Sequence, residues 1–150
     1  YPTPQELAEL AVSYADIEDG MAVLEPSAGQ GGIADYLPAG SMLVEVSVLH
    51  CEILKEKGHS NVVQGDFLNL SLGKFDRIAM NPPFSDGRWQ AHTEKAASHL
   101  ADDGVLVAIV PASAWQKYAI KGFDVDFMSK HDGAFDGTGV SVCIMRITRK

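Results

Sequence analysis

The sequence is poor in cysteine. Its two cysteines, Cys51 and Cys143, lie far apart, and neither belongs to a Cys-x-x-Cys pair. This spacing argues against a zinc site or a disulfide framework and favours a reducing, cytoplasmic compartment. The five histidines are scattered, so we expect no metal centre. His92 and His99 could share one helix face, and we expect both to be exposed.

Long apolar runs are also missing. No stretch approaches the roughly 20 residues needed to cross a bilayer, and no signal peptide opens the sequence. The 150 residues are 46% hydrophobic and contain no repeat or low-complexity tract. We therefore expect one domain, residues 1–150, with a substantial core and no membrane contact.

Basic residues are few. Lys and Arg number 12 against 20 Asp and Glu, which gives a formal net charge of −8. Because phosphate affinity comes from Lys and Arg, the charge disfavours sequence-independent binding of nucleic acid over the whole surface. A nucleic-acid substrate would need a local basic rim or a cationic partner.

What the sequence does contain is an alternation of strand and helix patterns. Short, almost wholly apolar runs, typical of strands buried on both faces, are separated by segments with helical spacing of apolar residues. The pattern predicts an α/β fold with a doubly wound, mostly parallel, seven-stranded sheet and a C-terminal antiparallel strand pair. The strands are expected at residues 21–25, 41–46, 61–65, 75–80, 105–110, 121–128 and 140–147.

The first helix has a recognisable start. Thr3 is expected to be its N-cap, with Pro4 in the first helical position and Glu6 closing a capping box. The Thr3 hydroxyl and the free N–H groups at that end could also meet an anionic group of a ligand.

The string Asn81-Pro82-Pro83-Phe84 directly follows the fourth expected strand. Two prolines end the strand and make a rigid loop, and open α/β sheets place their chemistry at such carboxyl ends. The Asn81 side-chain oxygen and the Pro82 carbonyl could each accept a hydrogen from one planar amine, while Phe84 stacks on the ring that carries it. A simple turn after a strand is the alternative.

A turn of small residues, 26–32, follows the first strand and would let a ligand approach the backbone closely. It departs from the dinucleotide fingerprint, because only Gly29 and Gly31 keep the G-x-G spacing and Glu25 and Pro26 precede them. The Glu25 carboxylate would repel a pyrophosphate and attract an ammonium group. A tight packing turn is the alternative.

Acidic residues also end the next two strands. Glu45 follows Glu25 by about 20 positions, the spacing at which an acidic residue meets ribose hydroxyls. Asp66 could accept a hydrogen bond from an adenine amino group, with Phe67 covering the ring. Solvated carboxylates outside any site are the alternative.

These features, with residues 1–4 before them and 135–140 after them, resemble class I S-adenosylmethionine-dependent methyltransferases. Among these the set is most similar to small phage and prophage enzymes that methylate adenine N6 in DNA. The resemblance implies S-adenosylmethionine as cofactor, with its methionine part at Thr3 and the Ser27 carbonyl and its ammonium near Glu25. It also implies ribose at Glu45, adenine at Asp66 and Phe67, and glycines Gly29 and Gly31 in the cofactor turn. The catalytic loop would be Asn81, Pro82, Pro83 and Phe84, with Asn81 also beside the cofactor.

The same loop resembles that of enzymes that methylate RNA base amines or a protein glutamine amide. A non-catalytic cofactor-binding subunit is a further alternative, and a dehydrogenase is disfavoured by the Glu25-Pro26 pair. Nucleic acid is the expected partner, with DNA favoured and RNA possible. No target-recognition domain follows the motifs, so a partner subunit could supply that function.

Overall fold

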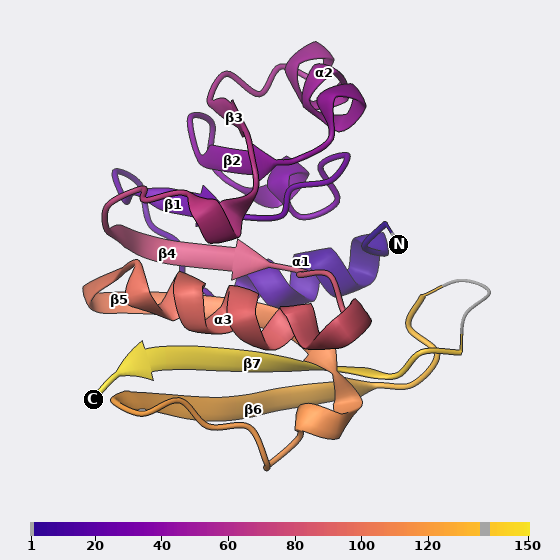
Figure 1. Cartoon of the computed structure of the whole chain (residues 1–150), viewed down its shortest axis with the longest axis vertical. Helices are drawn as coiled ribbons and strands as arrows, with labels where there is room; N and C mark the ends of the chain where they lie inside the picture. Colours follow the sequence, from indigo (N-terminus) through magenta and orange to yellow (C-terminus); the bar gives the residue numbers. More distant parts are fainter. Residues whose placement is uncertain (1, 136–138) are drawn as a thin grey trace.

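The apolar runs form the strands of a single sheet. In the computed structural model, which describes residues 2–135 and 139–150, seven strands lie in the order β3-β2-β1-β4-β5-β7-β6 (Figure 1). The strands are β1 Val23–Glu25, β2 Met42–Glu45, β3 Val62–Gln64, β4 Phe75–Met80, β5 Leu100–Pro111, β6 Phe123–His131 and β7 Val142–Arg149. The helices are α1 Gln5–Ser13, α2 Val48–Glu56 and α3 Arg88–Ser98, with 3₁₀ helices at Ala34–Tyr36, Phe67–Asn69, Ser85–Gly87 and Ala112–Ala114.

Strand direction follows the expected plan. β7 is antiparallel to both β5 and β6, and the other neighbouring pairs are parallel. The doubly wound, mostly parallel sheet with a closing antiparallel pair is therefore confirmed. The chain moves outward from β1 through β2 to β3 and then returns to β4 on the other side of β1. This reversal is the switch point at which open α/β sheets bind ligands, at the carboxyl ends of the strands.

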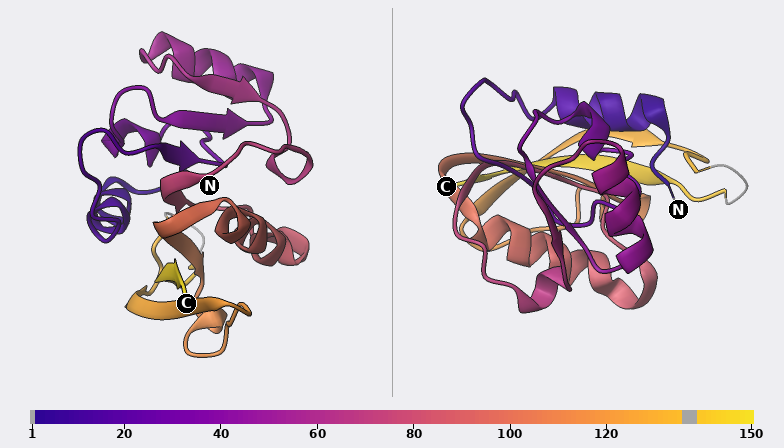
Figure 2. Two further views of the ribbon diagram at one scale, coloured as in Figure 1. Left: turned by 90° about the vertical axis from the view of Figure 1, so that its left-hand side faces the viewer. Right: turned by 90° about the horizontal axis from the view of Figure 1, so that it is seen from above.

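Both faces of the central sheet are covered, which explains why its strands lack polar alternation. Figure 2 shows α1 and α3 on opposite faces. Alternate residues of β5 pack toward these two layers: Val105, Val107 and Ile109 belong to the α1 cluster, and Leu106, Ala108 and Val110 to the α3 cluster. Burying each large aliphatic side chain contributes about 1.5–3 kcal/mol, so the two layers fix the strands that carry the loops.

The expected starts of α1 and β5 are wrong, and β1, β6 and β7 each begin two residues later than expected. α1 begins at Gln5 with Pro4 as its N-cap, and no side chain caps it by a hydrogen bond, so Thr3 and Glu6 form no capping box. Pro4 takes the extended cap conformation itself, which places Thr3 outside the helix. β5 begins at Leu100 rather than at Val105, because Leu100 pairs with Phe75 before a shift in register.

No helix in the described part of the chain is long and apolar enough to cross a membrane. Cys51 and Cys143 are both free thiols and both buried.

Candidate active site

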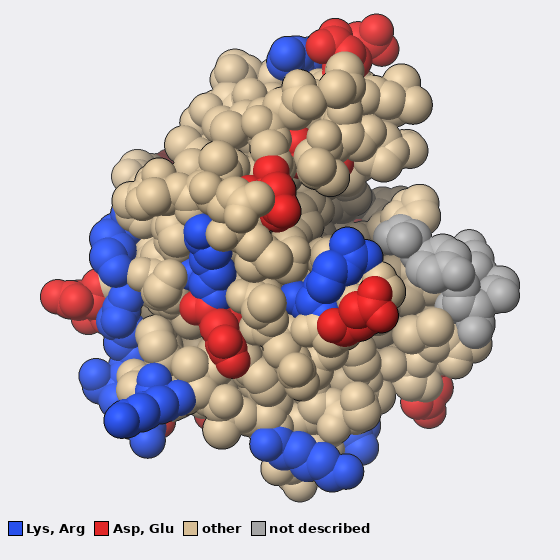
Figure 3. All heavy atoms as spheres, in the orientation of Figure 1, with Lys and Arg blue, Asp and Glu red and all other residues tan. Residues whose placement is uncertain are grey.

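A cavity of about 860 Å³ opens at the carboxyl ends of the central strands. This volume lies within the range of small-molecule and cofactor sites. The wall combines the turn after β1, the ends of β2 and β3, and the loop after β4. Figure 3 shows the surface hollowed on this face, with acidic side chains above the hollow and a basic side chain below it.

The Asn81 amide is held in a fixed orientation. Its Nδ2 donates to the Thr3 Oγ1 at 2.8 Å, a contact between residues 78 positions apart. The nitrogen end of the amide is thereby engaged, so the side-chain oxygen is the end left to accept a hydrogen from a ligand. Thr3 thus contributes to this site by orienting Asn81 instead of capping a helix.

The Phe84 ring, at the same wall of the cavity, is held in place by packing. It packs against both core clusters, and its ring meets Phe135 edge to face, with centroids 6.3 Å apart and an interplanar angle of 79°. Phe135 is the first residue of the 135–140 segment that contributed to the resemblance. Residues 136–138 of that segment lie outside the described residues.

Two carboxylates, Glu25 and Glu45, line the cavity near the turn after β1. Glu25 is only 1% exposed and accepts a hydrogen bond from the Ser27 N–H. Burial raises the pKa of Glu25 well above its ordinary value of 4.5, the Ser27 hydrogen bond lowers it, and the charge of Glu45 raises it further. Among the described residues, no cation forms an ion pair with Glu25. A ligand ammonium would fit this buried carboxyl, because a buried charge requires a partner.

Glu45 braces the loops on either side of it. Its Oε1 accepts from the Gly29 N–H at 2.8 Å and its Oε2 from the Ser47 N–H at 2.6 Å. The His50 Nδ1 lies 3.8 Å from the same Oε2. The carboxylate therefore links the turn after β1 to the start of α2.

A cation supports the turn after β1 from below. The Lys57 ammonium donates to the Gln30 carbonyl oxygen at 2.7 Å and to the Asp35 carboxylate. His59 contacts the same carboxylate, with its Nε2 2.9 Å from Oδ1. These contacts stabilise the backbone of Gln30, which lines the cavity.

The two glycines of the turn have different reasons to be glycine. Both have positive φ, +57° at Gly29 and +99° at Gly31. A Cβ at Gly29 would meet no atom within 4 Å, although this residue lines the cavity. A Cβ at Gly31 would lie 2.8 Å from Asp35 Oδ1 and 2.8 Å from the Lys57 ammonium. The φ of Gly31 lies beyond the left-handed region open to residues with a side chain, whereas Gly29 leaves a ligand room to approach.

This contrast predicts opposite phenotypes. Gly31→Ala should destabilise the fold by about 2–3 kcal/mol, because a φ of +99° is more strained for an L-residue than +57° and the new Cβ displaces the ends of Asp35 and Lys57. Gly29→Ala should cost only about 1 kcal/mol, from backbone strain alone, but should weaken the binding of a ligand in the cavity. Urea unfolding and calorimetric titration of both variants measure the two effects. Equal unfolding free energies for the two variants would contradict the assignment.

The Asp66 and Phe67 pair ends β3 as expected, but its surroundings were not foreseen. Asp66 Oδ1 accepts from the Leu68 N–H at 3.0 Å. Phe67 is 2% exposed, and its ring centroid lies 5.9 Å from that of His92 and 5.7 Å from that of His99. Both histidines are 8% exposed, so the expectation of surface histidines is wrong.

His92 is a site residue that the sequence reasoning missed. It lines the cavity, and burial lowers its pKa, which keeps the ring neutral at neutral pH. The signal was present in the spacing, because His92 shares the inward face of α3 with Trp89 and Ala96, three positions before and four after it.

Eleven of the twelve expected site residues line the cavity, and one does not. Gly31 does not line it, whereas the neighbouring Gly32 does. The expected residues found at the wall are Thr3, Glu25, Ser27, Gly29, Glu45, Asp66, Phe67, Asn81, Pro82, Pro83 and Phe84.

No protein-family model matches the sequence, and no curated protein sequence does. Several solved structures share the fold. A dimethyladenosine transferase from Plasmodium falciparum superposes with a TM-score of 0.78 at 16% identity, covering 99% of this chain and 62% of that one. A proposed RNA methyltransferase from Pyrococcus horikoshii gives 0.69 at 26% identity, covering 96% and 81%. Coclaurine N-methyltransferase, bound to N-methylheliamine and SAH, gives 0.62 at 16% identity, covering 84% and 50%.

The chain therefore has the seven-stranded fold of methyltransferases, as the resemblance implied. It spans 62% of the length of the dimethyladenosine transferase and 50% of that of coclaurine N-methyltransferase.

Proposed function

We propose that this chain is an S-adenosylmethionine-dependent methyltransferase that acts on an exocyclic amine, with adenine N6 in DNA as the favoured target. One observation carries the proposal: a single cavity joins the buried Glu25 carboxyl to the Asn81 amide, whose nitrogen is held by Thr3. The methyltransferase fold and a neighbour with bound SAH support the choice of cofactor.

The residues at one end of the cavity suit this cofactor. Glu25 would pair with the methionine ammonium, and Glu45 would accept from the ribose hydroxyls. The Ser27 hydroxyl is buried and has no hydrogen-bond partner within the described residues, so it offers a polar group to the ligand. Asp66 and Phe67 would hold the adenine. When bound, S-adenosylmethionine supplies an electrophilic methyl group on a sulfonium.

The residues at the other end suit an aromatic amine. Such an amine is a weak nucleophile, because its lone pair is delocalised into the ring. The Asn81 side-chain oxygen and the Pro82 carbonyl would each accept a hydrogen bond from one N–H of the amine. These two bonds would direct the nitrogen lone pair away from the ring. Phe84 would fix the ring plane, and alignment of nitrogen and methyl would lower the barrier further. The amine nitrogen would take the methyl as the carbon–sulfur bond broke, the electron pair of that bond would leave on the sulfur, and the N-methylated ammonium would release its proton to solvent.

Duplex DNA would have to expose its base to this cavity. Extruding a base costs a few kcal/mol, and the acidic chain has few cations to offset that cost. We therefore propose that a partner subunit or a further segment selects the target sequence. RNA is the second candidate substrate, favoured by the 26% identity to a proposed RNA methyltransferase.

Transfer of a labelled methyl group tests the proposal. The protein is incubated with labelled S-adenosylmethionine and, in turn, single-stranded DNA, duplex DNA, RNA and cell-extract protein. Nucleoside analysis of the product should show N6-methyladenine from DNA, with more from the single strand than from the duplex. Label found only in RNA, or only in glutamine, would show that RNA or protein, and not DNA, is the substrate. Cofactor binding without transfer to any acceptor would identify a non-catalytic subunit.

A further inference from the structure

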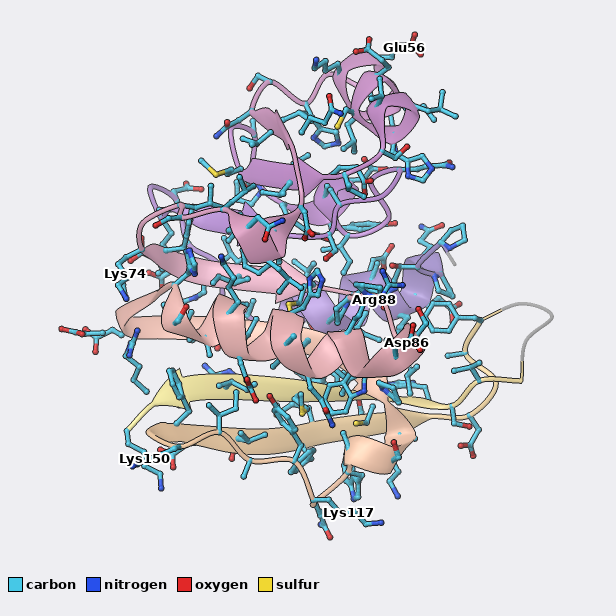
Figure 4. All side chains as sticks on the ribbon, viewed as in Figure 1. Glu56, Lys74, Asp86, Arg88, Lys117 and Lys150 are labelled. Carbon is cyan, nitrogen blue, oxygen red and sulfur yellow. The ribbon has the colours of Figure 1, made fainter. Side chains whose placement is uncertain are left out.

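Arg88 stands at the cavity wall next to the loop that would hold the target amine. It is the first residue of α3 and lines the cavity together with Asn81 and Phe84. Its Nε donates to the Ser85 carbonyl oxygen at 3.2 Å, and its Nη2 donates to the Ser85 hydroxyl. Because Ser85 directly follows Phe84, these contacts tie the guanidinium to the proposed base-binding loop. Figure 4 labels Arg88 at the carboxyl edge of the sheet, above Asp86.

The charge of Arg88 is distinctive in its surroundings. Of the described residues that line the cavity, it alone is Lys or Arg, and the acidic ones are Glu25, Glu45 and Asp66. No ion pair involves Arg88 in the part of the chain that the structure describes. The cavity is therefore acidic at its cofactor end and cationic beside Phe84, so an anionic group of a second ligand would be directed to Arg88.

We propose that Arg88 binds a backbone phosphate beside the target nucleotide, which makes nucleic acid, rather than a glutamine side chain, the substrate class of this site. The inference rests on the proposed function for the position of the base. A base is joined to its phosphates through one sugar, so a cation next to the base-binding loop is within reach of them. Guanidinium groups bind phosphate in a two-pronged, charge-assisted geometry. In a chain with net charge −8, such affinity has to be local.

Asp86 offers a variant of opposite effect. It is exposed, lies two residues before Arg88 and has a left-handed backbone, with φ +58°. Its negative charge would oppose an approaching phosphate. Asp86→Asn removes this charge, and asparagine tolerates the same backbone conformation. Lys117 is exposed, does not line the cavity and lies well below Arg88 in Figure 4, so Lys117→Gln is the matched control for the loss of one positive charge.

The experiment measures binding separately from catalysis. A fluorescent single-stranded oligonucleotide containing adenine is titrated with the wild type, Arg88→Gln, Asp86→Asn and Lys117→Gln in the presence of SAH, at several salt concentrations. Arg88→Gln should bind about 10-fold more weakly, and the slope of log K against log salt should become shallower by about 0.7. Asp86→Asn should bind more tightly, and Lys117→Gln should match the wild type.

Two further measurements separate the possible failures. SAH affinity, measured by calorimetry, should be equal in all four proteins, and Arg88→Gln should reduce methylation of the oligonucleotide more than methylation of free adenosine, which has no phosphate. An unchanged salt slope in Arg88→Gln, or an equal loss in Lys117→Gln, would overturn the phosphate contact. Methylation of glutamine peptides alone would also overturn it. Wild-type protein that binds the oligonucleotide through Arg88 but transfers no methyl group would leave the phosphate site standing and remove the proposed enzyme.

Discussion

Asn81→Ala should slow methyl transfer by about 10²–10³-fold while leaving the fold and cofactor affinity nearly unchanged. The substitution removes the oxygen proposed to accept one amine hydrogen, and it also frees the Thr3 hydroxyl that now accepts from Asn81 Nδ2 at 2.8 Å. Removing one preorganised polar group aimed at a transition state typically costs about 10²–10³ in kcat. Single-turnover transfer to a single-stranded oligonucleotide measures this loss, and calorimetry with SAH measures the retained affinity.

Two conservative variants sharpen this test. Asn81→Asp keeps an oxygen acceptor and should retain part of the activity. Thr3→Val removes only the group that orients the amide, and the net value of one hydrogen bond, about 1 kcal/mol, predicts a loss of about 5-fold. Activity in Asn81→Ala close to that of the wild type would show that the amine is held elsewhere.

Glu25→Gln should weaken cofactor binding by about 100-fold. The carboxyl is 1% exposed and has no cationic partner among the described residues. Removing one member of a buried ion pair costs about 3–5 kcal/mol, and a glutamine oxygen would still accept one hydrogen from the ammonium. Calorimetric titration with S-adenosylmethionine measures the change. Tight binding by the variant would place the ammonium away from Glu25.

The same substitution should stabilise the free protein, increasingly as pH rises. The pKa of Glu25 in the folded state lies above its ordinary value of 4.5, mainly because of burial. The folded state therefore holds this proton more tightly than the unfolded state, and the wild type loses stability as pH rises from 4.5 through the folded-state pKa. Glu25→Gln lacks this loss, so the difference in unfolding free energy should grow over that interval. Urea titrations from about pH 5 to pH 8 measure it; a constant difference would mean that Glu25 is ionised throughout.

Much of the sheet could be predicted because burial leaves a direct signal in the sequence. β5 is covered on both faces, so its residues from 105 to 110 are all apolar and the strand is evident. The residues at the carboxyl ends of the strands could then be predicted to lie together. Parallel strands that end at one edge bring Glu25, Glu45, Asp66 and Asn81 to one cavity.

The remaining features depend on contacts that no local pattern encodes. Thr3 matched the rule for a helix cap, but a hydrogen bond to a residue 78 positions away determines its role. His92 and His99 were expected at the surface because histidine is polar, yet each packs on the Phe67 ring. Gly31 fitted a ligand-binding pattern, whereas its lack of a side chain accommodates the Lys57 and Asp35 pair under the turn.

The hydrogen bond between Thr3 and Asn81 affects where the N-terminal boundary should be placed when this protein is expressed. A boundary drawn where regular secondary structure starts would fall at Gln5. Such a trimmed version would keep every helix and strand, and its circular dichroism would look intact. It would nonetheless lack the hydroxyl that sets the rotation of the Asn81 amide, so a functional unit of this protein has to begin ahead of its first helix.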